Sequence, residues 1–450
     1  MRLFRRSSDD TPSPAAEHEA AARAALRGDS DPRAALGHLR SGFAVDPAHR
    51  TLYALAAESL RQLGGENEAL LFEQALARFD TYQPFFELGY HFIEVGNDAL
   101  AVPFLERAHA LAPTDVPTAT ELALAVTAQF RPCRGREVLA KTNYTSSFSA
   151  AYQYHWCSLL CEKGEAETAE FIDGGRNAVR TGGVPAQWAS EVTVMLDKLD
   201  ACRERMQAIG KPEPFVRDWH FIQYGAAVLD FFDERSAEEG LSVAGGRYVY
   251  QSSDAASLYG ILERLGRFLE ILQRRPAQVL YVADRDSEIV GRAVAAVLGL
   301  PVDVATAENV AGPHRLIVAS DNHALADIAE ALLIPHEAQT VFSLVMDWLE
   351  PGVLTPDISG VMAQHFVLPW QSGLRIDPDT RQAVRTEPDT RPAAEIAAEL
   401  LSAEPTPDPR FERETLPFYQ RLRTLLKGVR EGDRRLRFSR DSPVPGAYFM

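Results

Sequence analysis

Acidic side chains that directly follow apolar, strand-like runs are the residues of this chain best suited to chemistry. Asp284 and Asp286 follow the run 279–283, and Asp321 follows the run 316–319. Parallel strands bind ligands beyond their carboxyl ends, so these three carboxylates are the candidate catalytic residues. Carboxylate oxygens suit a divalent cation such as Mg²⁺. The candidate ligand-binding residues at the same strand ends are Arg285, Ser287, Ser320, Asn322, His323 and Asp347.

Two other uses of these residues stay open, because a helix is predicted directly behind Asp286 and behind Asp321. The N-terminus of each helix could receive a small anionic ligand. Asp, Ser and Asn are also preferred N-cap residues, which would only satisfy the first N–H groups of each helix. The sequence contains no GxGxxG, GxxxxGK[ST], GxSxG or HExxH motif. We therefore expect a non-catalytic domain without a cofactor. The alternative is a metal-dependent enzyme, with Mg²⁺, that acts on a nucleotide or sugar phosphate.

These residues need a parallel sheet to bring them together, and the second half of the chain has the pattern of one. Helices at 287–298 and 322–333 alternate with β-prone runs. Such alternation predicts right-handed βαβ units and a small parallel sheet of about five strands. The expected strands are 279–283, 302–304, 316–319, 340–345 and 365–368.

The first half of the chain has a helical pattern that repeats every 33 residues. Pro47, Asp80 and Pro113 close three successive units. In the clearest unit, residues 85–113, Gly96-Asn97 turns the chain between two helices. Large and small residues follow in a fixed order on these helices: Phe85, Leu88, Gly89 and Phe92, then Ala101, Leu105 and Ala108. This order resembles the tetratricopeptide repeat (TPR), and the resemblance covers about 185 residues.

The TPR resemblance implies a stacked helical solenoid, since one unit cannot bury its apolar face alone. An irregular helical bundle is the alternative. The resemblance also implies a groove that holds an extended peptide or a helix of a protein partner. The candidate partner-binding residues are Tyr53, Glu58, Glu87, His91, Glu94, Glu121 and Tyr154. Their acidic members favour a basic or mixed-charge partner, so the leading function is a TPR-type interaction scaffold.

Two shorter resemblances concern the α/β half. Residues 279–301 resemble the first part of a type I phosphoribosyltransferase fold. In the corresponding later stretch, residues 317–324, only Asp321 matches the acidic pair of that family, and the Gly/Thr phosphate loop is missing. The resemblance therefore implies a degenerate, non-catalytic domain. Asp284-x-Asp286 is similar to the metal-binding DxD loops of glycosyltransferases.

Composition excludes some partners. The formal net charge of −17 argues against binding of DNA or of an anionic membrane, both of which need basic surface. No run of 18 or more apolar residues is present, so no membrane span is predicted. The four cysteines lack CxxC spacing, and Cys157 and Cys161 are one helical turn apart. They are expected to be reduced, in a cytoplasmic protein, with no metal site.

The expected fold class is α plus α/β, in four segments. Residues 1–15 form a disordered leader, 16–210 a TPR-like helical domain, and 215–375 the α/β domain. Residues 376–450 form an acidic, proline-rich linker and a basic C-terminal helix or tail. The basic segment is expected to be a solvated helix face, with docking onto the protein's own acidic surface as the alternative. The sequence leaves the oligomeric state open.

Overall fold

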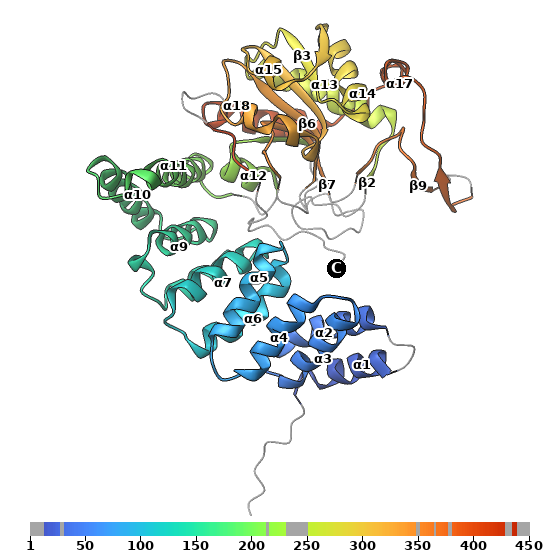
Figure 1. The fold of residues 1–450 in the computed structure, drawn as a ribbon. Coiled ribbons are helices and arrows are strands. Elements are labelled where there is room, and N and C mark those ends of the chain that lie inside the picture. Colours follow the sequence, from blue (N-terminus) through green and yellow to red (C-terminus); the bar gives the residue numbers. More distant parts are fainter. Residues whose placement is uncertain are drawn as a thin grey trace, which may run out of the picture. The chain divides into compact units, whose positions relative to one another are not determined.

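The chain divides into two units, residues 1–168 and 169–450, which are described separately from a computed structural model. The first unit is α-helical and the second is built on a parallel sheet, so the predicted α plus α/β class is confirmed (Figure 1). This boundary falls inside the helix Glu165–Arg180, whereas the sequence placed the end of the helical domain at residue 210. The structure describes residues 13–27, 31–212, 216–230, 251–347, 352–363, 366–376, 380–427 and 434–438. The predicted leader, residues 1–15, lies almost entirely outside these ranges.

Consecutive helices of the first unit pack as antiparallel pairs, and each pair packs on the next. Polar N-caps start several helices: Asp31 accepts from Arg33 N and Ala34 N, and Asp115 accepts from Thr118 N. The helices are α1 (Ala16–Arg27), α2 (Pro32–Val45), α3 (Arg50–Gln62), α4 (Glu66–Ala77), α5 (Gln83–Glu94), α6 (Asp98–Leu111), α7 (Val116–Ala128), α8 (Pro132–Leu139), α9 (Phe148–Leu160) and the start of α10 (Glu165–Arg180).

One aromatic core joins the first three helix pairs. Phe43 of α2 lies 4.9 Å from Phe104 of α6, ring centre to ring centre, and Phe72 of α4 lies 5.5 Å from the same ring. Tyr53 of α3 also packs on Phe104, at 5.9 Å. In a regular solenoid each repeat contacts only its neighbours. The contact between α2 and α6 therefore links the first pair directly to the third.

The cysteines differ from the expectation of four reduced thiols. Cys133 of α8 and Cys161, which ends α9, form a disulfide, whereas Cys157 and Cys202 are buried thiols outside this disulfide. Antiparallel packing of α8 and α9 brings the two Cα atoms to 5.4 Å, within the usual range for a disulfide. The spacing of the cysteines in sequence could not show this. The argument for a cytoplasmic location from reduced thiols is thereby removed.

The second unit contains a six-stranded sheet whose strands all run parallel, in the order β1-β7-β6-β5-β3-β4. If the strands β3 to β7 are numbered 1 to 5 in chain order, their order across the sheet from β4 to β7 is 2-1-3-4-5, a doubly wound order. β1 is added at the edge beside β7. The strands are β1 (Ala227–Asp230), β3 (Gln278–Tyr281), β4 (Val302–Val304), β5 (Arg315–Asp321), β6 (Thr340–Asp347) and β7 (Ile358–Ala363).

Four of the five predicted strands are confirmed in this sheet. The fifth, at 365–368, is instead the short strand β8 (Phe366–Val367), which pairs with β2 (Gln251–Ser252) outside the sheet. The sequence did not predict β1 or β7.

Helices cover both faces of the sheet, as the alternation of side chains along β5 requires. Leu316 and Val318 pack in one apolar cluster with α13 (Ala255–Ile271) and α14 (Arg285–Leu298). Ile317 and Ala319 pack in another cluster on the opposite face. That face is covered by α15 (Ala307–Val310), a 3-10 helix (His323–Ile328) and α16 (Ala329–Leu332). The other described helices of the unit are the rest of α10, α11 (Ala186–Ile209), α12 (Val216–Tyr224), α17 (Ala393–Leu400), a π-helix (Phe411–Thr415), α18 (Leu416–Arg421) and a 3-10 helix (Arg423–Leu425).

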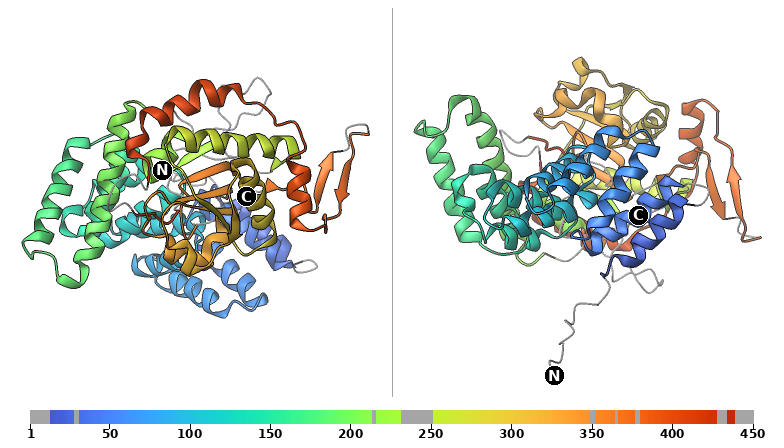
Figure 2. Two further views of the ribbon diagram at one scale, coloured as in Figure 1. Left: turned by 90° about the horizontal axis from the view of Figure 1, so that it is seen from above. Right: turned by 60° about the horizontal axis from the view of Figure 1, so that its bottom comes forward.

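Residues 393–426 of the C-terminal segment contribute side chains to the core of the α/β unit. Phe418, Leu422 and Leu426 of the basic segment are buried in the core with α13 and α14. Tyr419 accepts a hydrogen bond from Val228 N of β1 at 3.0 Å. The hairpin of β9 (Gly373–Ile376) and β10 (Ala383–Thr386) projects away from the rest of this unit (Figure 2).

Candidate functional site

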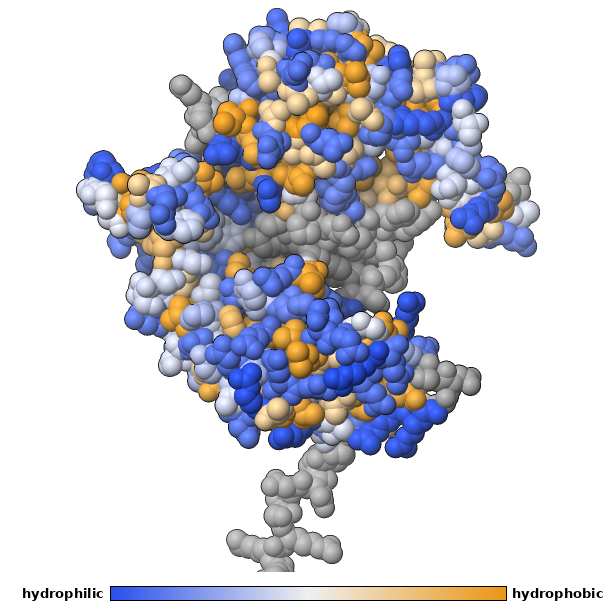
Figure 3. Space-filling view, viewed as in Figure 1, coloured by the Kyte–Doolittle hydropathy of each residue, from blue (hydrophilic) through white to orange (hydrophobic). Residues whose placement is uncertain are grey.

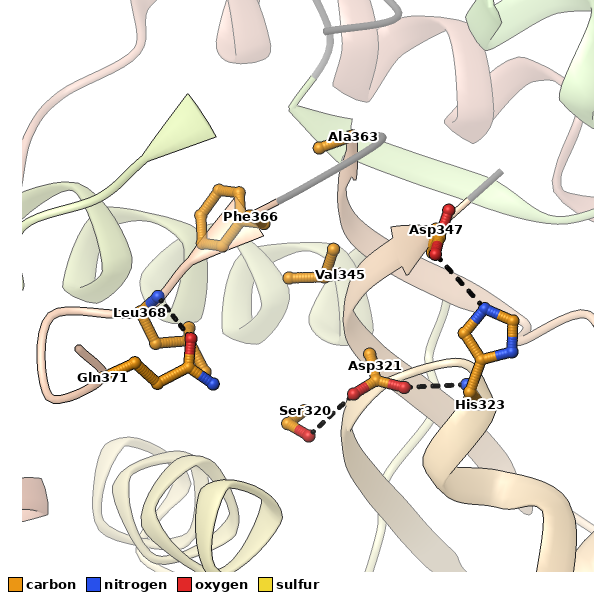
Figure 4. Close-up of a pocket in the computed structure, with 9 residues that line it drawn as sticks. All are labelled: Ser320, Asp321, His323, Val345, Asp347, Ala363, Phe366, Leu368 and Gln371. Carbon is orange, nitrogen blue, oxygen red and sulfur yellow. Dashed lines mark hydrogen bonds and ion pairs between the residues drawn. The ribbon is translucent and has the colours of Figure 1, made fainter. Parts of the chain in front are cut away.

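A cleft of about 300 Å³ lies where β5, β6 and β7 end (Figure 4). Asp321, Asp347 and Ala363 are the last residues of these strands. The predicted residues Ser320, Asp321, His323 and Asp347 meet here. The described residues that line the cleft are Ser320, Asp321, His323, Val345, Asp347, Ala363, Phe366, Leu368 and Gln371.

His323 connects the two carboxylates on the polar side of the cleft. Its Nε2 lies 3.4 Å from Asp347 Oδ2, and its backbone N–H donates to Asp321 Oδ1 at 2.8 Å. Asp321 Oδ1 also accepts from Ala324 N at 3.0 Å, so Asp321 starts the following 3-10 helix while it borders the cleft. The capping use of Asp321 and its position in a site are therefore compatible.

Ser320 is bonded toward the neighbouring helix rather than toward His323. Its backbone N–H donates to Ser287 Oγ at 2.8 Å, and the two hydroxyl oxygens lie 3.2 Å apart. Its own hydroxyl lies 3.4 Å from Asp321 Oδ2. A serine nucleophile needs a base within hydrogen-bond reach, and these contacts give Ser320 a serine and a carboxylate instead of the imidazole. Ser287 is fully buried and does not line the cleft.

The two other candidate catalytic residues do not reach the cleft lining. Asp284 caps α14, where its Oδ1 accepts from Ser287 N at 2.8 Å. Asp286 accepts from Trp370 Nε1 at 2.7 Å and from Gln371 Nε2 at 2.6 Å. Asp286 therefore fixes the segment that carries one wall of the cleft. The expected convergence of three aspartates is not found: of Asp284, Asp286 and Asp321, Asp321 alone lines the cleft.

Two predicted ligand-binding residues have structural contacts outside the cleft. Arg285 donates through Nη2 to the backbone carbonyls of Asp389 and Arg391, the latter at 3.0 Å. Asn322 is fully buried, and its Oδ1 accepts the backbone N–H of Asp347 at 2.7 Å. Asn322 thus holds the end of β6, and with it the carboxylate of Asp347, beside β5.

The cleft wall opposite the polar groups was not predicted. Phe366 and Leu368 come from the segment of β8, and Val345 and Ala363 come from the ends of β6 and β7. Gln371 is held by Asp286 and accepts Leu368 N at 3.1 Å. The apolar run at 365–368 was the available signal, but its position beside the sheet depends on pairing with β2, which the pattern of one segment cannot reveal.

The cleft lining carries two carboxylates and neither a lysine nor an arginine among the described residues. Within the described ranges, no group of three or more His, Cys, Asp or Glu side chains is placed to hold a metal ion. The arrangement therefore offers hydrogen-bond acceptors and an apolar wall.

The predicted partner-binding residues of the helical unit have different environments. Tyr53 is fully buried, its hydroxyl donates to Pro47 O at 2.7 Å, and burial raises the pKa of its phenol. It packs among aromatic rings and offers no surface to a partner. Glu58 and Glu94 are exposed, whereas Glu87 and His91 are half-buried.

The two remaining predictions lie further along the unit. Glu121 is half-buried, and desolvation raises the pKa of its carboxyl group. Tyr154 stacks on Tyr144, with 4.0 Å between ring centres, and Arg136 lies over its ring at 5.3 Å. An exposed ring was missed: Tyr90 of α5 is 40% exposed and stacks on Phe86 at 5.9 Å.

The chain gives no match to a protein-family model and none to a curated protein. Among the described helices, none is both long and apolar enough to cross a membrane.

Proposed function

We propose that the protein is a TPR-type scaffold whose helical unit binds a protein or peptide partner, with an α/β unit that is not catalytic. One observation carries the proposal. The first helices of three successive pairs begin at Arg50, Gln83 and Val116, 33 residues apart each time. This interval is that of the sequence repeat, and stacked helix pairs of this length are typical of repeat scaffolds.

Close packing of small residues inside the pairs also supports the proposal. Gly89 of α5 faces Leu105 of α6, and a Cβ at Gly89 would lie 2.6 Å from Leu105 Cγ. Ala101 and Ala108 of α6 are fully buried. Gly and Ala let the two helices of a pair approach closely, which is the role of the small residues in the repeat pattern.

The partner surface is proposed on the first helices, at Glu58 of α3 and at Tyr90 and Glu94 of α5. The face of the helical unit in Figure 3 is mainly hydrophilic, with small apolar groups between. Tyr90 is exposed one helical turn before Glu94. An aromatic ring beside a carboxylate favours a basic or mixed-charge partner, because aromatic anchors contribute much of the binding energy and charges guide the encounter.

A charge reversal on these helices tests the proposal. The double variant Glu58→Lys, Glu94→Lys of the full chain should bind a protein captured by the unmodified chain at least tenfold more weakly than the unmodified chain does. The control is Glu66→Lys, Glu137→Lys, which makes the same charge change at exposed positions of α4 and α8, the second helices of their pairs. Affinity capture followed by a direct binding measurement gives the result. Equal affinity of both variants, or no protein captured by the unmodified chain, would contradict the scaffold.

The metal-dependent enzyme that acts on a nucleotide or sugar phosphate has less support. Asp284 and Asp286 are engaged in a helix cap and in a loop contact, so one predicted catalytic carboxylate is left at the cleft. Nucleophilic or acid–base chemistry also lacks an imidazole bonded to Ser320 in the contacts described above.

A further inference from the structure

We propose that the cleft at the ends of β5, β6 and β7 binds an uncharged molecule with several hydroxyl groups, such as a sugar or an unphosphorylated nucleoside. Asp321 and Asp347 accept hydrogen bonds from its hydroxyl groups, and the apolar wall packs on its ring. This site is independent of the partner surface on the helical unit, so either proposal can fail alone.

The charges of the cleft disfavour a phosphate. Two carboxylates and no lysine or arginine line it among the described residues, so an anion would meet like charges without a compensating partner. Parallel α/β folds often seat phosphate at a helix N-terminus. Here the N-terminus of α14 is capped by Asp284 and has Asp286 and Glu288 in its first turn. Arg285, which could have offset these charges, donates to the carbonyls of Asp389 and Arg391.

The spacing of the carboxylates favours several hydroxyl groups over a single cation. Asp321 pairs in register with Val345, so Asp347 lies two residues further along β6. With strands ~4.8 Å apart and a rise of ~3.3 Å per residue, the two α-carbons lie roughly 8 Å from each other. A sugar ring presents hydroxyls in different directions and can reach both carboxylates. Divalent cations need oxygen ligands within about 2.6 Å, and no such cluster occurs among the described residues.

Asp321 has acceptor capacity for such a ligand. A carboxylate accepts about four hydrogen bonds, and the Oδ1 of Asp321 takes two from backbone N–H groups. Its Oδ2 points toward Ser320 on the cleft side (Figure 4). Ser320 and His323 add further polar groups on the same side.

The opposite wall supplies the apolar contact that a sugar or base ring needs. Phe366 and Leu368 form it, and Asp286 holds the adjoining residues Trp370 and Gln371 by two short hydrogen bonds. The volume of about 300 Å³ lies at the lower end of the range for small-molecule sites, which suits a single sugar or nucleoside. Asp286 is thus a positioning residue for the wall rather than a ligand contact.

Matched pairs of probes test the charge of the ligand. Calorimetry and thermal shift of the full chain are measured with ribose and ribose 5-phosphate, glucose and glucose 6-phosphate, and adenosine and adenosine monophosphate. We expect binding of at least one uncharged probe, with its phosphorylated counterpart at least tenfold weaker. Tighter binding of the phosphorylated member, or no binding of any uncharged probe, would overturn the proposal.

Variants of the cleft test the residues. Asp347→Asn should weaken binding of the uncharged probe at least tenfold. It should also reduce the ratio of the affinities for the uncharged and the phosphorylated probe, which loss of a purely structural role would not do. Phe366→Ala should weaken the binding of both probes of a pair. This second variant still tests the site if Asp347→Asn does not fold. Asp303→Asn, at an exposed position of β4, is the control and should bind like the unmodified chain. If both cleft variants bound the uncharged probe with unchanged affinity, the assignment of these residues to a binding site would be wrong.

Discussion

Arg435 and Asp357 form a two-pronged ion pair inside the α/β unit, with Nε to Oδ1 at 2.9 Å and Nη2 to Oδ2 at 2.7 Å. The two side chains are 0% and 2% exposed. Arg435 belongs to the basic C-terminal segment, and Asp357 directly precedes β7. The expectation of a solvated basic face is therefore wrong at Arg435, and the alternative of docking onto the protein's own acidic groups holds there. Burial is tolerated because Arg435 also donates to Leu332 O and to Gln339 Oε1, each at 2.7 Å.

Replacement of Arg435 by methionine should destabilise the α/β unit strongly. The change leaves the Asp357 carboxylate buried without its main partner, which costs about 3–5 kcal/mol. Urea unfolding followed by circular dichroism measures the change. Arg437→Met, at an exposed position two residues on, should alter the free energy of unfolding by less than about 0.5 kcal/mol. If both variants reduced the free energy of unfolding by a similar amount, the buried ion pair would contribute no more to stability than an exposed arginine.

Two glycines of the helical unit should respond to alanine in opposite directions. At Gly89 a Cβ would lie 2.6 Å from Leu105 Cγ, so Gly89→Ala overpacks the α5–α6 contact and should cost about 1–3 kcal/mol. At Gly37, in the exposed part of α2, a Cβ meets nothing within 4 Å. Gly37→Ala should therefore stabilise the helix by about 0.5–1 kcal/mol. Thermal unfolding of the two variants compares them, and a shift of the same sign in both would contradict the packing argument.

The stability of the helical unit should fall as the pH is lowered below neutrality. Burial lowers the pKa of His155 to about 4, and its Nδ1 lies 3.0 Å from Thr168 Oγ1. An unfolded histidine has a pKa of about 6.5, so between about pH 6.5 and 4 the unfolded state binds more protons than the folded one. The contribution is complete above about pH 6.5 and is lost as the pH falls toward 4.

Melting temperatures from pH 7.5 to 4 measure this dependence. His155→Gln should flatten the slope in that window, whereas His38→Gln, at an exposed position of α2, should leave it unchanged. An equally steep slope in His155→Gln would assign the effect to other groups.

Peptide mapping should find one disulfide under non-reducing conditions. The expected linked peptides carry Cys133 and Cys161, while Cys157 and Cys202 should react with alkylating reagent only after unfolding, since both are buried. The double variant Cys133→Ser, Cys161→Ser should unfold at a lower temperature, because a link across 28 residues restricts the unfolded chain by about 3–4 kcal/mol in the entropic account. Alkylation of all four cysteines without prior reduction would contradict the pairing.

Local patterns predicted the elements that local interactions determine. The run 279–283 and the helix 287–298 appear as β3 (Gln278–Tyr281) and α14 (Arg285–Leu298), which ends at Gly299 in the left-handed conformation. Long-range pairing could not be predicted. The four-residue strand β1 pairs with β7, which lies more than a hundred residues later in the chain. For the same reason the run 365–368 was assigned to the wrong sheet.

The candidate site was likewise predictable from local patterns only in part. Asp321 and Asp347 were predicted because strand ends of a parallel sheet share one edge. Asp284 and Asp286 were expected there too, but each is nearer to another donor: the N–H of Ser287 for the first, and Trp370 with Gln371 for the second. The position of these residues at the strand ends was predictable, and so was the N-cap role of Asp284. The contacts of Asp286 depend on the segment at 366–371, whose place in space the sequence pattern did not indicate.

The contact between Phe43 and Phe104 limits how the first unit can vary in length. Self-contained repeats can be added or removed one at a time, because each needs only its neighbours. Here the second pair lies in sequence between α2 and α6, which contact each other through Phe43 and Phe104. Duplication or deletion of one pair would therefore separate these two rings. The first three pairs are expected to be inherited, and to be engineered, as one indivisible block, with changes in repeat number confined to the helices that follow.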